Sequence, residues 1–169
     1  STGSRALLRL KDGRTLLRRQ IDVIRQVFGS PEIIVVVGHD IEKVVKSLPD
    51  GVRVVENEYY DETGAARSVA MGMRATSTKR CLVIYGDLVF NRETLTGMLP
   101  DKSAVILDSK NRIPHADVGV NLDGGRVVHF DYGLKPRWTQ ITMLVGRELS
   151  IFKSFGALAT RRRHMGFEV

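Results

Sequence analysis

The sequence predicts an α/β fold of the doubly wound class, with a mostly parallel sheet and an antiparallel hairpin. Up to residue 108, short apolar runs rich in Val and Ile alternate with amphipathic stretches. This alternation is typical of right-handed crossover connections between parallel strands. After Asp117, two strand-like runs flank a DGG turn, which indicates a hairpin. With 169 residues and 43% hydrophobic content, the chain is expected to form a single domain.

The first expected helix covers residues 15–28. Its apolar side chains, from Leu17 to Phe28, recur at helical spacing and leave the arginines on the opposite face. Gly29 and Pro31 follow directly and end the helix. An amphipathic helix of this kind packs its apolar face on a core.

The strand expected next, at residues 32–38, is apolar on both faces, which favours a central position in the sheet over an edge position. The remaining expected elements are a helix at 41–48 capped by Asp40, a strand at 52–57, a helix at 64–76 behind Thr63, a strand at 79–87, a helix at 92–99 capped by Asn91, a strand at 103–108, and the hairpin strands at 116–122 and 126–130.

The composition limits the class of protein. Cys81 is the one cysteine and lies within an apolar run, so we expect it in the core and expect no disulfide. The sequence has no apolar run long enough to span a membrane, and its first residues lack the apolar region of a signal peptide. A soluble, cytoplasmic protein is therefore predicted.

The charge is concentrated near the beginning of the chain. The net charge is +7, and residues 1–30 carry seven basic side chains against two aspartates. Such a surplus suggests an anionic partner, either nucleic acid or a small phosphorylated ligand. Aromatic side chains for stacking on bases are absent among these arginines until Phe28, so a phosphorylated ligand fits at least as well. A solvated helix face is the simpler alternative.

The stretch LVIYGDLVF at residues 82–90 interrupts an apolar run with Gly86 and Asp87. Burying an unpaired carboxylate costs several kcal/mol or more, so something must compensate Asp87. Ligands of open α/β sheets bind beyond the carboxyl ends of the strands, where a cation could neutralise Asp87 and Gly86 would let a ligand approach the backbone. Alternatively, Asp87 ends the strand and bonds the following turn.

Several motifs in order resemble a known family. These are TGSR, DGRTLLRRQIDVIRQV, IIVVVGHDIEKV, VVENEYY, SVAMGM, LVIYGDLVF, YGLKPRW and MGFEV. In this order and spacing they resemble the NTP-transferase family, which contains sugar-1-phosphate nucleotidylyltransferases and phosphocholine cytidylyltransferases. The resemblance implies a Rossmann-like fold of the nucleotide-diphospho-sugar transferase type. It also implies transfer of a nucleoside monophosphate to a phosphorylated sugar or small alcohol, with release of pyrophosphate and with Mg²⁺ as cofactor.

The resemblance also implies roles for individual residues. The implied catalytic residues are Arg5, Asp87 and Lys135, with Asp87 as the metal ligand. The implied nucleotide-binding residues are Thr2, Gly3, Ser4, Arg5 and Gly86. The implied substrate-binding residues are Gly64, Arg67, Ser68, Lys135 and Glu168. The implied partners are a nucleoside triphosphate and a phosphorylated acceptor; a homo-oligomer is compatible with the sequence, while nucleic acid and membrane are not expected.

The sequence also departs from the family pattern. One nucleotidyltransferase domain is expected over residues 1–169, but the family's first strand, the loop lysine that reaches the phosphates and a late acidic metal ligand have no counterpart in these residues. Three hypotheses follow. The ordered motifs support an active nucleotidyltransferase, the absent lysine motivates an inactive relative that senses nucleotides, and the basic first thirty residues motivate a nucleic-acid-binding α/β domain.

Overall fold

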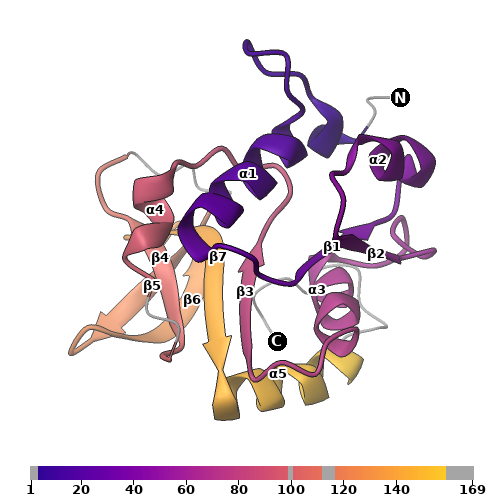
Figure 1. Ribbon diagram of the computed structural model, residues 1–169. Coiled ribbons are helices and arrows are strands. Elements are labelled where there is room, and N and C mark those ends of the chain that lie inside the picture. The colour runs from indigo at the N-terminus through magenta and orange to yellow at the C-terminus, as the bar shows by residue number, and fades with distance from the viewer. Residues whose placement is uncertain (1–3, 99–100, 112–116, 159–169) are drawn as a thin grey trace.

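The computed structural model describes residues 4–98, 101–111 and 117–158, with side chains up to residue 154 (Figure 1). Its helices are a 3-10 turn at Arg5–Leu7, α1 Leu16–Phe28, α2 Ile41–Ser47, α3 Ala65–Arg74, α4 Arg92–Thr96 and α5 Gly146–Leu158. Its strands are β1 Ile33–Val37, β2 Val52–Glu56, β3 Arg80–Ile84, β4 Ala104–Asp108, β5 Val118–Asp123, β6 Arg126–Tyr132 and β7 Arg137–Val145. The α/β class predicted from the sequence is confirmed.

The strands form two sheets. β1 and β2 form a parallel pair, and the second sheet has the order β3-β7-β5-β6, with β4 also paired to β7. β7 runs antiparallel to both β3 and β4, so these two strands point in the same direction without pairing. Within the described ranges, only β1 and β2 are paired in parallel. The sequence predicted a mostly parallel sheet, so the observed strand pairing is less parallel than expected.

The edges of β7 place the end of β3 beside β5. Thr142 pairs with Val83 on one edge and with Val105 of β4 on the other. Arg137 pairs with β4 and also with Gly119 of β5, so β3 and β5 lie along the same edge of β7. The chain that follows β3 therefore leaves the sheet where β5 joins it.

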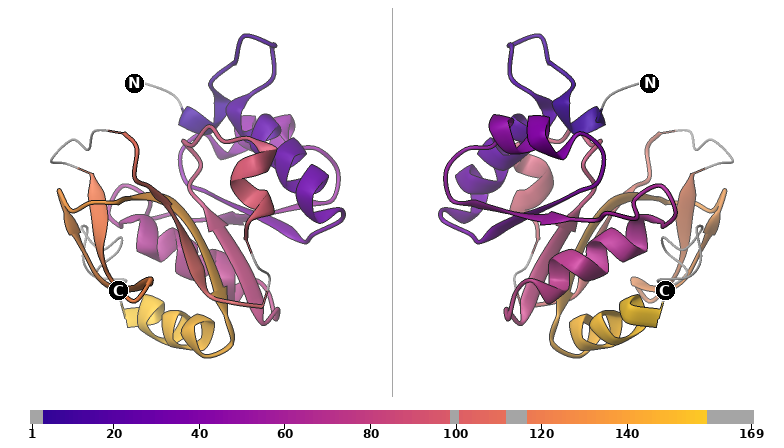
Figure 2. Two further views of the ribbon diagram at one scale, coloured as in Figure 1. Left: turned by 90° about the vertical axis from the view of Figure 1, so that its left-hand side faces the viewer. Right: turned by 90° about the vertical axis from the view of Figure 1, so that its right-hand side faces the viewer.

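Two hydrophobic clusters form the core, and α1 contributes to both. Val23 of α1 packs with buried residues of α4 and β7, whereas Leu17 and Ile21 pack with buried residues of β1 and α2. Ile24 lies against both clusters. Helix α3 contacts β1 and α5, and α5 contacts β7 (Figure 2). The two sheets share no strand pairing in the described residues, so α1 and the α3 and α5 pair join them.

Most local predictions are confirmed. Thr15 caps α1 by accepting a hydrogen bond from the Arg18 N–H, and Gly29 ends the helix with φ 75°. Asn91 caps α4 through its side chain. The DGG turn joins β5 and β6, with Gly124 and Gly125 both at positive φ.

Other predictions were wrong in detail. Asp40 precedes α2 in a left-handed conformation, φ 59°, and its side chain does not cap the helix, because it accepts hydrogen bonds from Ser4 and Lys43 instead. Helix α3 covers Ala65–Arg74, shorter than the expected 64–76, and its N-cap residue is Gly64. β1 has one strand neighbour in the described chain, so the central position expected for it is not observed. β7 and α5 are additional elements that were not predicted from the sequence.

The state of Cys81 and the length of the helices bear on two expectations from the sequence. Cys81 is a free thiol on β3 that is half-buried, and burial raises its pKa. Among the described helices, none has the length and apolar character needed to cross a lipid bilayer.

Candidate active site at the end of strand β3

Asp87 lies in the loop that follows β3, and Arg5 reaches it from the beginning of the chain. The Arg5 Nη1 atom donates a hydrogen bond to the Asp87 Oδ2 atom at 2.7 Å, across 82 residues of sequence. The exposed fractions of the two side chains are 76% and 38%, so the carboxylate lies open to solvent and is not neutralised by a buried cation. The exposed ion pair itself adds little stability, about 0–1 kcal/mol.

This geometry explains why the apolar run tolerates an aspartate. The strand ends at Ile84, three residues before Asp87, so the carboxylate avoids the desolvation cost of a buried position. A Cβ atom built on Gly86 would meet no atom within 4 Å, so the protein's own packing does not require glycine there. The open space beside Gly86 is consistent with the close ligand approach expected from the sequence.

Ser4, directly before Arg5, is anchored to the other sheet. The Ser4 N–H donates to the Asp40 Oδ2 atom at 3.2 Å, just after the end of β1. Lys43 and then the Ser4 N–H are the largest causes that lower the pKa of the Asp40 carboxyl. Ser4 and Arg5 therefore lie between the ends of β1 and β3. Thr2 and Gly3 lie outside the described residues.

A buried amide organises the loop between β2 and α3. Asn57 is 1% exposed, and its Nδ2 atom donates to Thr63 Oγ1 and to Ser68 Oγ, each at 3.1 Å. Its Oδ1 atom accepts from the Tyr59 N–H at 3.2 Å. Ser68, an expected substrate ligand, is thus already one partner in an internal network. The sequence analysis missed Asn57, although a polar residue directly after an apolar strand is a usable signal.

Replacing Asn57 with alanine is expected to lower the free energy of unfolding by about 1–3 kcal/mol, because the Tyr59 N–H loses a buried acceptor. Urea denaturation monitored by circular dichroism measures the loss. Asn121→Ala is the matched control, since Asn121 is exposed on β5. Equal midpoints for the two variants would show that the network does not stabilise the loop.

The chain before β7 carries Lys135, which is exposed. A Cβ atom built on Gly119 of β5 would lie 1.8 Å from the Leu134 carbonyl oxygen, so the two backbones touch. The Val120 N–H donates to the Pro136 carbonyl at 3.0 Å. β5 therefore fixes the backbone on both sides of Lys135.

Arg137 ties the first residue of β7 to two carboxylates. It donates to Asp117 at 3.1 Å and to Asp108 at 3.4 Å. The pKa of Asp108 is lowered to about 2, chiefly by the Asn111 side chain and by backbone N–H groups of the following turn, with a smaller contribution from Arg137. These ion pairs hold the start of β7 against the end of β4, although the buried Nε atom of Arg137 has no hydrogen-bond partner among the described residues.

Trp138 connects this region to the loop that carries Asp87. Its ring lies 5.8 Å from that of Tyr85 and 5.6 Å from that of Phe130, both in edge-to-face orientation. Trp138 is half-buried. The ring contact between Trp138 and Tyr85 therefore joins the beginning of β7 to the loop after β3.

The structure thus brings together only part of the predicted site. Ser4, Arg5, Gly86 and Asp87 gather at the ends of β1 and β3. Gly64, Arg67 and Ser68 lie at the beginning of α3, Lys135 precedes β7, and Glu168 lies outside the described residues.

No group of three or more potential metal ligands occurs within the described residues. Magnesium is commonly held by one or two carboxylates together with substrate phosphates and water. The open carboxylate of Asp87 fits that donor set as a single protein ligand.

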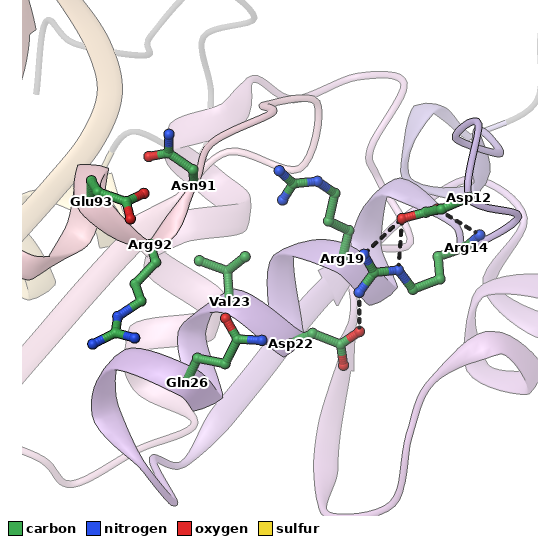
Figure 3. A pocket seen from close by; sticks show the side chains of 9 residues that line it. All are labelled: Asp12, Arg14, Arg19, Asp22, Val23, Gln26, Asn91, Arg92 and Glu93. Atoms are coloured by element: carbon green, nitrogen blue, oxygen red, sulfur yellow. Dashed lines mark hydrogen bonds and ion pairs between the residues drawn. The ribbon is translucent and has the colours of Figure 1, made fainter.

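A separate cavity of about 390 Å³ lies between α1 and the beginning of α4 (Figure 3). Its charged lining consists of Asp12, Arg14, Arg19, Asp22, Arg92 and Glu93. Arg14 is already bonded to Asp12 and Asp22, and Arg19 to the Phe90 carbonyl. The cavity has equal numbers of positive and negative side chains and contains none of the predicted site residues, so it is not the candidate site.

Comparison with known proteins gives matches to nucleotidyltransferases. Residues 2–143 match the family described as the MobA-like NTP transferase domain. The bifunctional IPC transferase and DIPP synthase of Rubrobacter xylanophilus is 36% identical over 135 residues, which are 75% of this chain and 30% of that protein. The bifunctional protein GlmU of Alkaliphilus metalliredigens is 40% identical over 88 residues, 52% of this chain and 19% of that protein. The chain therefore spans less than a third of either relative.

Solved structures share the fold at low identity. CTP:phosphocholine cytidylyltransferase LicC from Streptococcus pneumoniae superimposes with a TM-score of 0.69 and 17% identity, over 92% of this chain and 67% of that one. A putative glucose-1-phosphate thymidylyltransferase from Bacillus anthracis gives a TM-score of 0.70 and 19% identity, with the same two coverages of 92% and 67%. These similarities show a Rossmann-like nucleotidyltransferase fold.

Proposed function

The chain belongs to the MobA-like NTP transferase family, and on that premise we propose that it transfers a nucleoside monophosphate from a nucleoside triphosphate to a phosphorylated sugar or small alcohol. The observation that carries the proposal is the pairing of Arg5 with Asp87 at the open end of β3. These two residues are far apart in sequence, and both were assigned to the reaction from the family pattern.

The proposed reaction needs no protein nucleophile. A phosphate oxygen of the acceptor attacks the α-phosphorus, the bond between this phosphorus and the bridging oxygen to the β-phosphate breaks, and pyrophosphate leaves with the bonding electrons. The protein has to bring two polyanions together and stabilise the charge that develops. Asp87 would hold Mg²⁺, which when bound neutralises phosphate charge.

Arg5 is proposed to exchange its partner when the triphosphate binds. In the structure its guanidinium is bonded to Asp87. The pair is exposed, so separating it costs little free energy. A phosphate offers the same planar donors a bidentate acceptor of higher charge. Lys135, exposed and with its backbone held by β5, is proposed to bind the acceptor phosphate as a point charge.

The test is a panel assay of pyrophosphate release. CTP and dTTP come first, because the fold relatives named above are a cytidylyltransferase and a thymidylyltransferase. Each triphosphate is combined with glucose 1-phosphate, a polyol phosphate and phosphocholine in the presence of Mg²⁺. Pyrophosphate that requires both substrates supports the proposal. Triphosphate binding without release would indicate the inactive nucleotide-sensing relative, and absence of both would refute the proposal.

Most of the basic residues near the beginning of the chain have partners within the protein. Six of the seven basic residues within positions 1–30 donate to a carboxylate or carbonyl of the protein itself, namely Arg5, Arg9, Arg14, Arg18, Arg19 and Arg25. Three of these bonds, from Arg9, Arg19 and Arg25, go to uncharged carbonyls and leave the positive surplus in place, so nucleic-acid binding stays a hypothesis from the sequence. Cytoplasmic location and homo-oligomer formation stay predictions from the sequence.

A further inference from the structure

The loop that carries Asp87 is held by a buried amide on helix α1. Gln20 is 5% exposed, and its Nε2 atom donates to the Tyr85 carbonyl at 3.1 Å and to the Leu88 carbonyl at 2.8 Å. These two carbonyls flank Gly86 and Asp87 directly. A single primary amide with both hydrogens engaged sets the separation of the two ends of this turn.

The neighbouring residue on the helix holds the far end of the same loop. The Arg19 Nη1 atom donates to the Phe90 carbonyl at 2.9 Å. Adjacent side chains of α1 thus bind three carbonyls of residues 85–90, and Figure 1 shows this segment passing beside α1 on its way from β3 to α4. A buried carbonyl left without a donor costs more than an ordinary hydrogen bond gains, so this arrangement favours one loop conformation.

The Asp87 side chain has little else to fix it. Its partner Arg5 is 76% exposed, and the space beside Gly86 is open. The position of the carboxylate therefore depends on the backbone of the loop. Rate losses of about 100-fold can follow from displacements on the order of 1 Å in a reacting group.

We infer that Gln20 is a positioning residue for Asp87, acting by clamping the backbone on both sides of it. The kinetic consequence rests on the proposed function, whereas the clamp itself does not. The Gln20 amide donates to the loop that carries Asp87, so its loss should affect the reacting geometry rather than acceptor binding.

The test compares Gln20→Met with Gln26→Met. Methionine keeps the length and the packing of the side chain but donates no hydrogen bond, and Gln26 is an exposed residue of the same helix. Hydrogen exchange by mass spectrometry is followed on peptides covering residues 85–90 and residues 33–37, and kcat and KM are measured well below the melting temperature.

For Gln20→Met we expect faster exchange in residues 85–90 with unchanged exchange in residues 33–37. We also expect kcat to fall by about 10- to 100-fold, with the acceptor KM within about twofold of wild type. Gln26→Met should leave both the exchange in residues 85–90 and kcat unchanged. Unchanged loop exchange, or a general rise in exchange with an unchanged kcat, would overturn the inference.

A second variant covers the case in which Gln20→Met does not fold. Arg19→Met removes the bond to Phe90 from a position that is only half-buried, and it should loosen the loop at its far end. Unchanged exchange in that variant would also contradict the clamp. If the wild type shows no turnover, the proposed function fails, while the exchange comparison still decides whether α1 clamps the loop.

Discussion

Asp87→Asn is expected to lower kcat by at least about 100-fold, the loss that follows removal of one group that stabilises transition-state charge. Asparagine keeps the shape of the side chain and can still contact Arg5, but it lacks the negative charge that holds a divalent cation. The Arg5–Asp87 pair is exposed on both sides, so the variant should lose at most about 1 kcal/mol of stability. Pyrophosphate release under saturating substrates measures the effect.

Asp101→Asn provides the control for Asp87→Asn, because Asp101 is an exposed aspartate outside the helices and strands. It should leave kcat unchanged. If Asp87→Asn retained wild-type kcat and the same dependence on Mg²⁺, the assignment of Asp87 as metal ligand would be wrong.

Gly119→Ala is expected to destabilise the protein by roughly 1–3 kcal/mol, the usual cost of forcing an additional carbon into a packed interior. The new Cβ would lie 1.8 Å from the Leu134 carbonyl oxygen and 2.4 Å from its carbonyl carbon. Both atoms belong to backbone, which cannot turn away as a flexible side chain can. The chain around Lys135 must therefore move, so the acceptor KM should rise together with the loss of stability.

Urea denaturation and acceptor titration measure the two effects of Gly119→Ala. Gly97→Ala is the matched control, because a Cβ there meets no atom within 4 Å and the residue has an ordinary φ of −82°. A Gly119→Ala variant as stable as Gly97→Ala would contradict the close approach of β5 to this segment.

Local patterns predicted most of the secondary structure but not the arrangement of the sheet. Residues 15–28 and the DGG hairpin were predictable because periodicity and turn chemistry are encoded over a few neighbours. β7 contains Trp, Thr, Ile and Val in a nine-residue run, which is itself a strand signal. Its insertion between β3 and β4 depends on contacts between distant segments, and no local pattern specifies these.

The candidate site was predictable to a similar degree. The family pattern identified Arg5 and Asp87, but these residues are 82 positions apart and nothing in the sequence shows that they touch. Gln20 and Asn57 both lie within the family motifs, but the sequence does not show which backbone or hydroxyl groups their amides contact. Gln20 follows Leu17 by three positions and so occupies the apolar face of α1, where a polar side chain signals a specific buried partner.

Because helices join the two sheets in the described residues, the sheets can move relative to each other without loss of strand pairing. Ser4 bonds to the region after β1, and Arg5 bonds to the loop after β3. The candidate site therefore lies across the boundary between the two sheets, here called the seam, where the described residues form no strand pairing. Partial opening along this seam would part Arg5 from Asp87 while each sheet stays intact. On the proposed function, a triphosphate bound from both sides would favour the closed state by mass action, so its binding should increase the protection of α1 from proteases.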